Sequence, residues 1–184
     1  QAGAAVTTGI QNVLVGSLAG DALQAAGDNV AVGFEALTTE TGGQNNVAIG
    51  PRTLKAQVNS SGNIYNTAVG SNAGTAVTTG IQNTLVGGNA GDAITDADYN
   101  TVVGQGALGS DTLGSRSTAV GYRALETQNF TTATDTHNTA VGYASGNALT
   151  TGNQTTLIGS LAGDAYTVGG TNVAVGYLAL SADT

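Results

Sequence analysis

Few side chains in this chain could perform chemistry, and their spacing argues against a catalytic site. The chain contains one histidine, His137, and no cysteine. A catalytic centre needs a nucleophile, a base and a group that orients the base, or else a cluster of metal ligands. A lone histidine supplies none of these sets. We therefore expect His137 to be a solvated residue, and we expect no enzymatic activity and no cofactor.

The acidic residues form one regular pattern, an Ala-Gly-Asp-Ala segment. It places Asp21, Asp92 and Asp164 at intervals of 71 and 72 residues. Calcium-binding repeat arrays use a Gly-Gly-x-Gly-x-Asp nonapeptide, which this sequence lacks. We expect capping or solvated carboxylates here and no metal site within the chain. An ion shared between chains is the alternative.

The remaining candidates are aromatic and cationic side chains. Phe34, Tyr122, Tyr143 and Tyr177 each follow a glycine directly. Aromatic rings at turns can stack on sugars, and packing over a neighbouring part of the fold is the alternative.

The net charge of −8 excludes the basic footprint that nucleic-acid binding requires. No apolar run approaches the roughly 20 residues of a membrane span, so we expect no membrane insertion.

The elements that present these side chains are set by a repeated pentapeptide, mostly Asn-Thr-Ala-Val-Gly. It ends at ten glycines, which we call the anchor glycines: Gly16, Gly33, Gly50, Gly70, Gly87, Gly104, Gly121, Gly142, Gly159 and Gly176. They lie 17 residues apart, except for two intervals of 20 and 21 residues. A unit this short, here called a coil, cannot enclose a core alone, so its copies must stack.

The residues before each anchor glycine predict a short strand. Val or Ile comes directly before it, preceded by Ala, Leu or Val and then by Thr or Val. Such runs are typical of strands, and their apolar faces predict burial on both sides. Four residues before the anchor glycine stands the ladder position, which holds Asn12, Asn29, Asn46, Asn66, Asn83, Asn100, Asn138 and Asn172, with Ser117 and Thr155 as exceptions. In stacked coils these amides are expected to hydrogen-bond to one another; a row of ligand amides is the alternative.

Three further positions complete the coil. Seven residues before the anchor glycine, Gly predominates, which predicts a turn with positive φ. Four residues after the anchor glycine stands either Gly or Leu, and we name the coils Gly coils and Leu coils accordingly. Seven residues after the anchor glycine, Gly coils carry an apolar residue. Leu coils instead carry Glu40, Gln57, Asp111, Gln128 or Asp183 there. Each coil thus delivers one large apolar side chain from one of two places, as conservation of core volume predicts.

The Gly and Leu coils alternate in an order that repeats every four coils. This predicts one repeat array over residues 1–184, with super-repeats of about 5–75 and 76–147 and a partial one over 148–184. The two long coils fall in the same phase and are expected to bulge outward. Because the chain begins at Gln1 in mid-repeat, we expect it to be a fragment of a longer fibre.

The coil length predicts the architecture. Seventeen residues give a perimeter of about 56 Å, which fits a flattened coil with two short strands and two turns. The sequence therefore predicts an all-β fold, a parallel β-roll or β-solenoid of about ten 17-residue coils. The coil interior is thin and leaves several apolar positions over, an excess that predicts association between chains.

The pattern Asn-Thr-Ala-Val-Gly-x-x-Ala, and Asn46-Val-Ala-Ile-Gly50 in particular, resembles the head repeats of trimeric autotransporter adhesins. The resemblance implies a left-handed β-roll, a homotrimer, inward Val and Ile side chains and a bacterial surface location. That family's repeat is shorter. The Thr-Thr-Gly turns and the alternation of Ala-Gly with Ala-Leu are similar to the repeat arrays of bacteriophage tail fibres.

These observations predict a structural shaft or head segment of a trimeric extracellular fibre that attaches to a host or surface, on a virion or a bacterial cell. A bacterial adhesin head and a carbohydrate-binding or carbohydrate-cleaving β-solenoid are the alternatives. We expect contact with a host glycan or protein receptor in the long coils, residues 51–66 and 122–138, because loops on a rigid scaffold concentrate recognition. The candidate contact residues are Arg52, Lys55, Tyr65, Tyr122, Arg123, Phe130, His137 and Tyr143.

Overall fold

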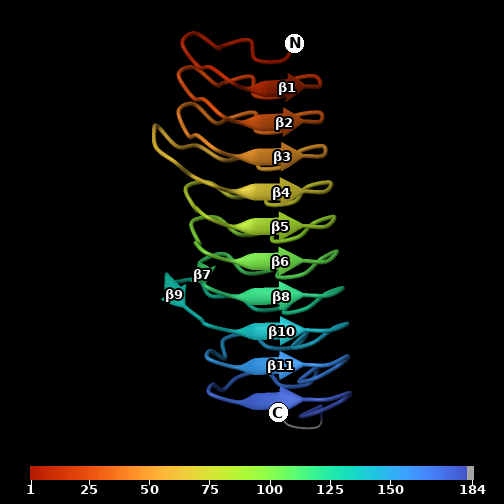
Figure 1. Ribbon diagram of the computed structural model, residues 1–184. Coiled ribbons are helices and arrows are strands. Elements are labelled where there is room, and N and C mark those ends of the chain that lie inside the picture. Colours follow the sequence, from red (N-terminus) through yellow and green to blue (C-terminus); the bar gives the residue numbers. More distant parts are fainter. Residues whose placement is uncertain (182–184) are drawn as a thin grey trace.

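The computed structural model describes residues 1–181, which form an all-β solenoid of stacked coils without a helix in that range (Figure 1). Ten three-residue strands build one parallel sheet: β1 (Val13–Val15), β2 (Val30–Val32), β3 (Val47–Ile49), β4 (Thr67–Val69), β5 (Thr84–Val86), β6 (Thr101–Val103), β8 (Thr118–Val120), β10 (Thr139–Val141), β11 (Thr156–Ile158) and β12 (Val173–Val175). The predicted fold, an all-β solenoid of about ten 17-residue coils, is confirmed.

Strand register is the same in short and long coils. Across the first long coil Val47 lies opposite Thr67, and across the second Thr118 lies opposite Thr139, so the same strand positions pair as elsewhere. The extra residues leave the coil on the side where the strands begin, at the left of Figure 1. Insertions therefore change one edge of the solenoid and leave the sheet intact.

The prediction of two strands per coil is wrong. Within residues 1–181 a second strand forms at only one place, where β7 (Gly114–Ser115) pairs with β9 (Thr134–Asp135) in a separate two-stranded sheet. At the equivalent level of the first long coil an isolated bridge joins Gln44 and Asn63. Turns build the rest of each coil, and many of their non-glycine residues have left-handed φ angles, such as 51° at Leu37.

The core is a narrow column of small and branched side chains. The middle residue of each strand points inward, as the fully buried Ala119 does, and it packs with a large side chain such as Leu108 or Ile94, both also fully buried. The sequence predicted burial on both sides of the strand, and this prediction is wrong. Val or Ile directly before the anchor glycine points out of the coil, with Val103 38% and Ile49 40% exposed. In a single chain these side chains are therefore outward, not inward.

The asparagine ladder forms, but it mostly connects side chains to backbone. The Asn83 Oδ1 accepts from the backbone N–H of Asn100 at 2.9 Å, and the Asn83 Nδ2 donates to the Ala97 carbonyl at 2.8 Å. The same pair of bonds is made by Asn66 and Asn100. Each buried amide thus satisfies one donor and one acceptor of the next coil, which explains why Asn predominates there. A direct amide-to-amide bond joins Asn46 to Asn29.

Glycine is needed at two positions of the coil for different reasons. The anchor glycines have φ between 125° and 143°, and a Cβ added at Gly104 would lie 2.1 Å from the next anchor carbonyl. Seven residues before the anchor glycine, the predicted positive φ is found at Gly169 (132°) but is absent from the other five glycines, Gly9, Gly43, Gly80, Gly114 and Gly152. At Gly9 and Gly80 a Cβ would lie 2.2 Å and 2.4 Å from a carbonyl oxygen of the next coil. At these two glycines close packing, not turn geometry, selects glycine.

Candidate functional site

The predicted contact residues lie on two edges of the solenoid, not on one loop surface. We call the turn that follows each strand the exit edge and the segment that precedes each strand the entry edge; they lie at the right and left of Figure 1. The long coils add residues only at the entry edge. The exit edge carries Arg52, Lys55, Tyr122, Arg123 and Tyr143, and the entry edge carries Tyr65 and His137.

Phe130 does not belong to either surface. It was predicted as a contact residue, but only 8% of it is exposed. Its backbone N–H donates to the Asp111 Oδ1 at 2.9 Å, and its carbonyl accepts from the Leu113 N–H at 2.9 Å. An aromatic ring in a polar loop suggested exposure, whereas these bonds turn the residue into the coil. It cannot contact a partner without local opening.

The first exit cluster consists of Phe34, Glu35, Arg52 and Lys55. The Lys55 Nζ lies 2.7 Å and the Arg52 Nε 3.4 Å from the Glu35 Oε2, and the Arg52 guanidinium carbon lies 5.9 Å from the Phe34 ring centre. The hydrogen bond from Lys55 lowers the pKa of Glu35, with the nearby Arg52 charge acting in the same direction. Phe34 is 45% exposed. The cluster therefore presents an open ring edged by two cations and one carboxylate.

The second exit cluster lies at the second long coil and contains Tyr122, Arg123, Glu126, Tyr143 and Asn147. The rings of Tyr122 and Tyr143 stack with centroids 5.4 Å apart and an angle of 12°. Arg123 pairs with Glu126 at 3.0 Å and lies over the Tyr122 ring at 5.6 Å, while the Asn147 Nδ2 donates to Glu126 at 2.7 Å. The two tyrosines thus pack on each other between neighbouring coils, and they remain 40% and 55% exposed.

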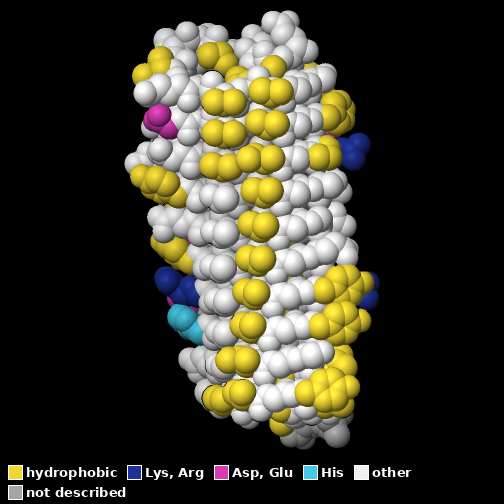
Figure 2. Space-filling model, turned by 45° about the vertical axis from the view of Figure 1, so that its right-hand side comes forward, with side chains coloured by type: hydrophobic (Ala, Val, Ile, Leu, Met, Phe, Trp, Pro, Cys, Tyr) yellow, Lys and Arg dark blue, Asp and Glu magenta, His cyan; other side chains and the backbone are white. Residues whose placement is uncertain are grey.

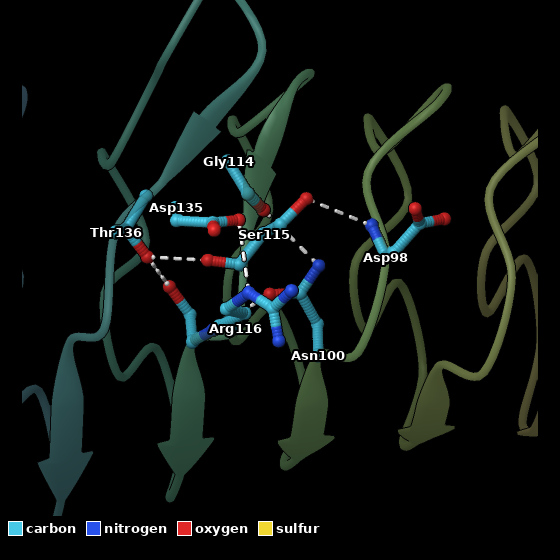
Figure 3. Close-up of polar contacts among 8 residues, drawn as sticks. Asp98, Asn100, Gly114, Ser115, Arg116, Asp135 and Thr136 are labelled. Carbon is cyan, nitrogen blue, oxygen red and sulfur yellow. Dashed lines mark hydrogen bonds and ion pairs between the residues drawn. The ribbon is translucent and has the colours of Figure 1, made fainter.

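A third cluster on the entry edge was not predicted. Arg116 pairs with Asp135 at 2.9 Å, and its guanidinium carbon lies 4.8 Å from the Tyr99 ring centre. Beside it, the Asp98 N–H donates to the Ser115 Oγ at 3.0 Å (Figure 3). Burial raises the pKa of Asp98, although a backbone N–H donated to its carboxylate opposes this shift.

The sequence contained a signal for this entry cluster. Tyr99 and Arg116 stand one residue before the ladder position, where Tyr65 and His137 stand in other coils. All four side chains are exposed, and their residues share a left-handed φ between 52° and 65°. The column of these positions therefore projects side chains along the whole entry edge. The prediction missed Tyr99 and Arg116 because neither residue lies in a long coil.

The Ala-Gly-Asp-Ala carboxylates remain separate. Burial raises the pKa of Asp92, and a buried Oδ1 of Asp164 has no hydrogen-bond partner within the described part of the chain. In residues 1–181 no three His, Cys, Asp or Glu side chains gather as a metal site would require. The same residues include no helix that is long and apolar enough to cross a membrane.

The three clusters combine exposed aromatic rings with paired charges, an arrangement suited to binding polar surfaces such as sugars or protein side chains. No protein-family model, curated protein or solved structure matches the chain. The functional argument therefore depends on the geometry of the solenoid and on the character of its exposed surfaces.

Proposed function

We propose that this chain is a shaft or head segment of a homotrimeric extracellular fibre that attaches its bearer to a host or another surface. The fibre would project from a virion, as a tail fibre does, or from a bacterial cell. The observation that carries this proposal is an apolar column along the sheet. We call it the valine column, and it consists of the Val or Ile directly before each anchor glycine.

The valine column runs the length of the solenoid, and Figure 2 shows it as a continuous line of hydrophobic side chains. Its exposed members are Val15, Ile49, Val103, Val141, Ile158 and Val175, each between 36% and 66% exposed. In the first three coils and the last, a second apolar residue such as Val13 widens the strip. Contiguous apolar surface of this kind marks an interface.

Another copy of this chain is the partner that fits the valine column best. The column repeats once per coil, so a second solenoid laid along the first offers the same spacing and can contact it in every coil. A globular partner would match only part of this length. Three copies are proposed because the repeats resemble those of trimeric adhesin heads.

Attachment is assigned to the exit and entry clusters. Along the valine column each coil presents similar small and apolar side chains, which gives length and stiffness but little selectivity. The clusters add aromatic and charged groups at separate levels, and a trimer would present each of them three times, with multivalent gain. The exposed stack of Tyr122 and Tyr143 favours a carbohydrate as the partner, and a protein receptor is the alternative.

Sedimentation velocity at micromolar concentration tests the trimer. We expect a particle of three times the 17.9 kDa chain mass. A double variant, Val103→Glu with Val141→Glu, places charges in the valine column and should sediment as a monomer. The matched control, Gln105→Glu with Gln154→Glu, adds the same charge at exposed positions outside the strands and should remain trimeric. A folded wild-type monomer under these conditions overturns the proposal.

Attachment is tested with labelled trimer on an array of immobilised glycans and on a panel of host surface proteins. Binding to either class supports the assignment, provided that Tyr143→Ala or Arg116→Gln reduces it while the trimer persists. If the wild type binds neither class, or if both variants bind as well as the wild type, this segment acts only as a spacer.

A further inference from the structure

Two pairs of polar side chains are buried where most other coils have an apolar residue. Seven residues after the anchor glycine, four of the five Gly coils carry the fully buried Leu23, Val77, Ile94 or Leu149, and the fifth carries Tyr166, which is 7% exposed. The described Leu coils carry Glu40, Gln57, Asp111 and Gln128 at this position, at most 1% exposed. Asp183, the fifth member of the set, lies outside the described residues. Each pair consists of an acid in one coil and a glutamine in the long coil that follows.

At the first long coil the acid collects backbone donors. The Glu40 Oε1 accepts from the N–H groups of residues 41–43 at 2.8–3.1 Å and from the Asn59 N–H at 3.0 Å. Its Oε2 accepts from the Gln57 Nε2 at 2.8 Å. The Gln57 Oε1 then accepts from the Nδ2 of Asn66, at the ladder position, at 2.9 Å. Buried hydrogen bonds thus connect residue 59, near the start of the insertion, with residue 66, near its end.

The second long coil repeats this arrangement with a shorter acid. The Asp111 Oδ1 accepts from the Phe130 N–H at 2.9 Å and from the Gly114 N–H at 3.1 Å, and its Oδ2 accepts from the Gln128 Nε2. The Gln128 Oε1 accepts from the Asn138 Nδ2 at 2.8 Å. Asn59 and Phe130 occupy the same place, nine residues after the anchor glycine.

The residue nine positions after the anchor glycine behaves differently in Gly coils and in Leu coils. In Gly coils it is exposed, as at Ala25, Thr79, Asp96, Thr151 and Val168, whereas in the short Leu coils that carry the acid it is buried at Gly42 and half-buried at Leu113. In the long coils it is half-buried at Asn59 and buried at Phe130, with its N–H turned toward the acid. The Leu coils, which carry the acid or the glutamine, therefore share an inward turn of the chain that Gly coils do not make.

We propose that Glu40–Gln57–Asn66 and Asp111–Gln128–Asn138 are loop clamps, which close the necks of the inserted loops and thereby position the entry-edge residues Tyr65 and His137. The clamp holds residues on both sides of each insertion, so the exposed residues between them are free to differ. The two loops do differ in sequence and in length, while the clamp residues keep the same order of acid, glutamine and asparagine. Only the positioning of contact residues rests on the proposed attachment function; the clamp itself does not.

A carboxylate is required because its neighbours are donors. Glu40 faces backbone N–H groups on one oxygen and an amide NH₂ on the other. An amide in its place would direct its own N–H groups at one set of these donors and leave buried groups unsatisfied. The leucine four residues after the anchor glycine supplies the apolar volume in these coils, which frees the seventh position for the clamp.

Hydrogen exchange of backbone amides, followed by mass spectrometry, tests the clamps in the full chain. The near-isosteric variants are Glu40→Gln and Asp111→Asn, and each serves as a control for the other. Glu40→Gln should accelerate exchange in residues 58–66 by roughly tenfold to a hundredfold and leave residues 129–138 unchanged. Asp111→Asn should do the reverse. As a further control, Ser60, Ser61 and Asn63, all exposed, are replaced together by glycine, which should leave exchange at residues 59 and 66 within about threefold of wild type.

Three results overturn the clamp. The first is unchanged exchange in both loops of the acid variants, and the second is acceleration spread equally over the two loops. The third is a loss of protection at residues 59 and 66 in the triple-glycine variant, which would mean that the loop's own side chains hold its neck. If Glu40→Gln does not fold, the Asp111→Asn variant and the triple-glycine variant still decide between these outcomes. Loss of glycan or receptor binding with intact clamps would instead count against the proposed function.

Discussion

At position 108 a glycine variant should be at least as stable as an alanine variant, although alanine is usually the more stabilising of the two residues. Leu108 is fully buried and has a φ of 49°. Leu149 is fully buried too, in a coil of the other type, but its φ lies outside the left-handed region. The two leucines fill the same core column from different positions. They therefore form a matched pair that differs mainly in backbone conformation.

The expected magnitudes follow from three terms. Removing either buried leucine side chain should cost about 2–5 kcal/mol. Glycine in place of alanine costs a further 0.5–1 kcal/mol or so through backbone entropy at an ordinary position such as Leu149. At Leu108 the left-handed backbone penalises alanine by about 1–2 kcal/mol, and glycine escapes this penalty. Leu108→Gly should thus be as stable as Leu108→Ala or about 1 kcal/mol more stable, whereas Leu149→Gly should be less stable than Leu149→Ala.

Guanidinium unfolding followed by far-UV circular dichroism measures the four variants. All are compared at one chain concentration, because association would make the midpoint depend on concentration. The comparison within each pair cancels the loss of side-chain burial and isolates the backbone contribution. Leu108→Gly could prove less stable than Leu108→Ala by the same margin that separates the Leu149 variants. In that case the left-handed geometry contributes nothing to stability, and the alternation of Gly and Leu needs another explanation.

Three further predictions concern one anchor glycine and the titration of two half-buried acids, Glu35 and Asp92. Gly104→Ala should lower the melting temperature sharply, because its Cβ would lie 2.1 Å from a carbonyl at a φ of 143°, whereas Gly88→Ala, whose nearest neighbour lies 3.7 Å away, should melt within a few degrees of wild type. Lys55 lowers the pKa of Glu35, so this pair stabilises the fold above the ordinary pKa of 4.5 and loses its effect as pH falls through the lowered value. Lys55→Met should therefore flatten the acid limb of stability against pH, and an unaltered limb would contradict the coupling. Burial raises the pKa of Asp92, so its ionised form opposes folding. Asp92→Asn should raise the melting temperature at pH 7 but not below its ordinary value of 3.8; an equal rise at both pH values would refute the titration argument.

The sequence predicted the features that stacking alone determines. A fixed interval between glycines requires parallel strands in register, and the β-branched residues before them placed these strands correctly. The absence of a second strand from most coils could not be predicted. Residues such as Leu37 and Arg52 have left-handed φ angles of 51° and 58°, although neither residue type favours that conformation. Stacking on neighbouring coils imposes it, and a local pattern does not contain that information.

The candidate site could be predicted in part. The sequence pointed to Tyr122 and Tyr143, which do meet in a stack, because both follow an anchor glycine. It did not show that an insertion extends only the entry edge, so residues near the insertion in sequence were assigned to one surface when they lie on two. Phe130 was misplaced for a related reason. Its burial depends on Asp111 in the preceding coil, a contact that spacing within one coil cannot reveal.

The clamps give the alternation of Gly and Leu coils a second cause besides volume. If conservation of core volume were sufficient, any residue that fits would serve at the seventh position of a Leu coil, and the order of coil types would be free. Instead the two complete pairs of Leu coils, at Leu37 and Leu54 and at Leu108 and Leu125, place an acid before a glutamine and end in a long coil. Moving the apolar volume to the fourth position frees the seventh for a clamp, and the clamp sets where the chain can leave the stack. The super-repeat of four coils is thus the spacing between loop sites, and the Gly coils between them fix how far apart those sites lie along the solenoid.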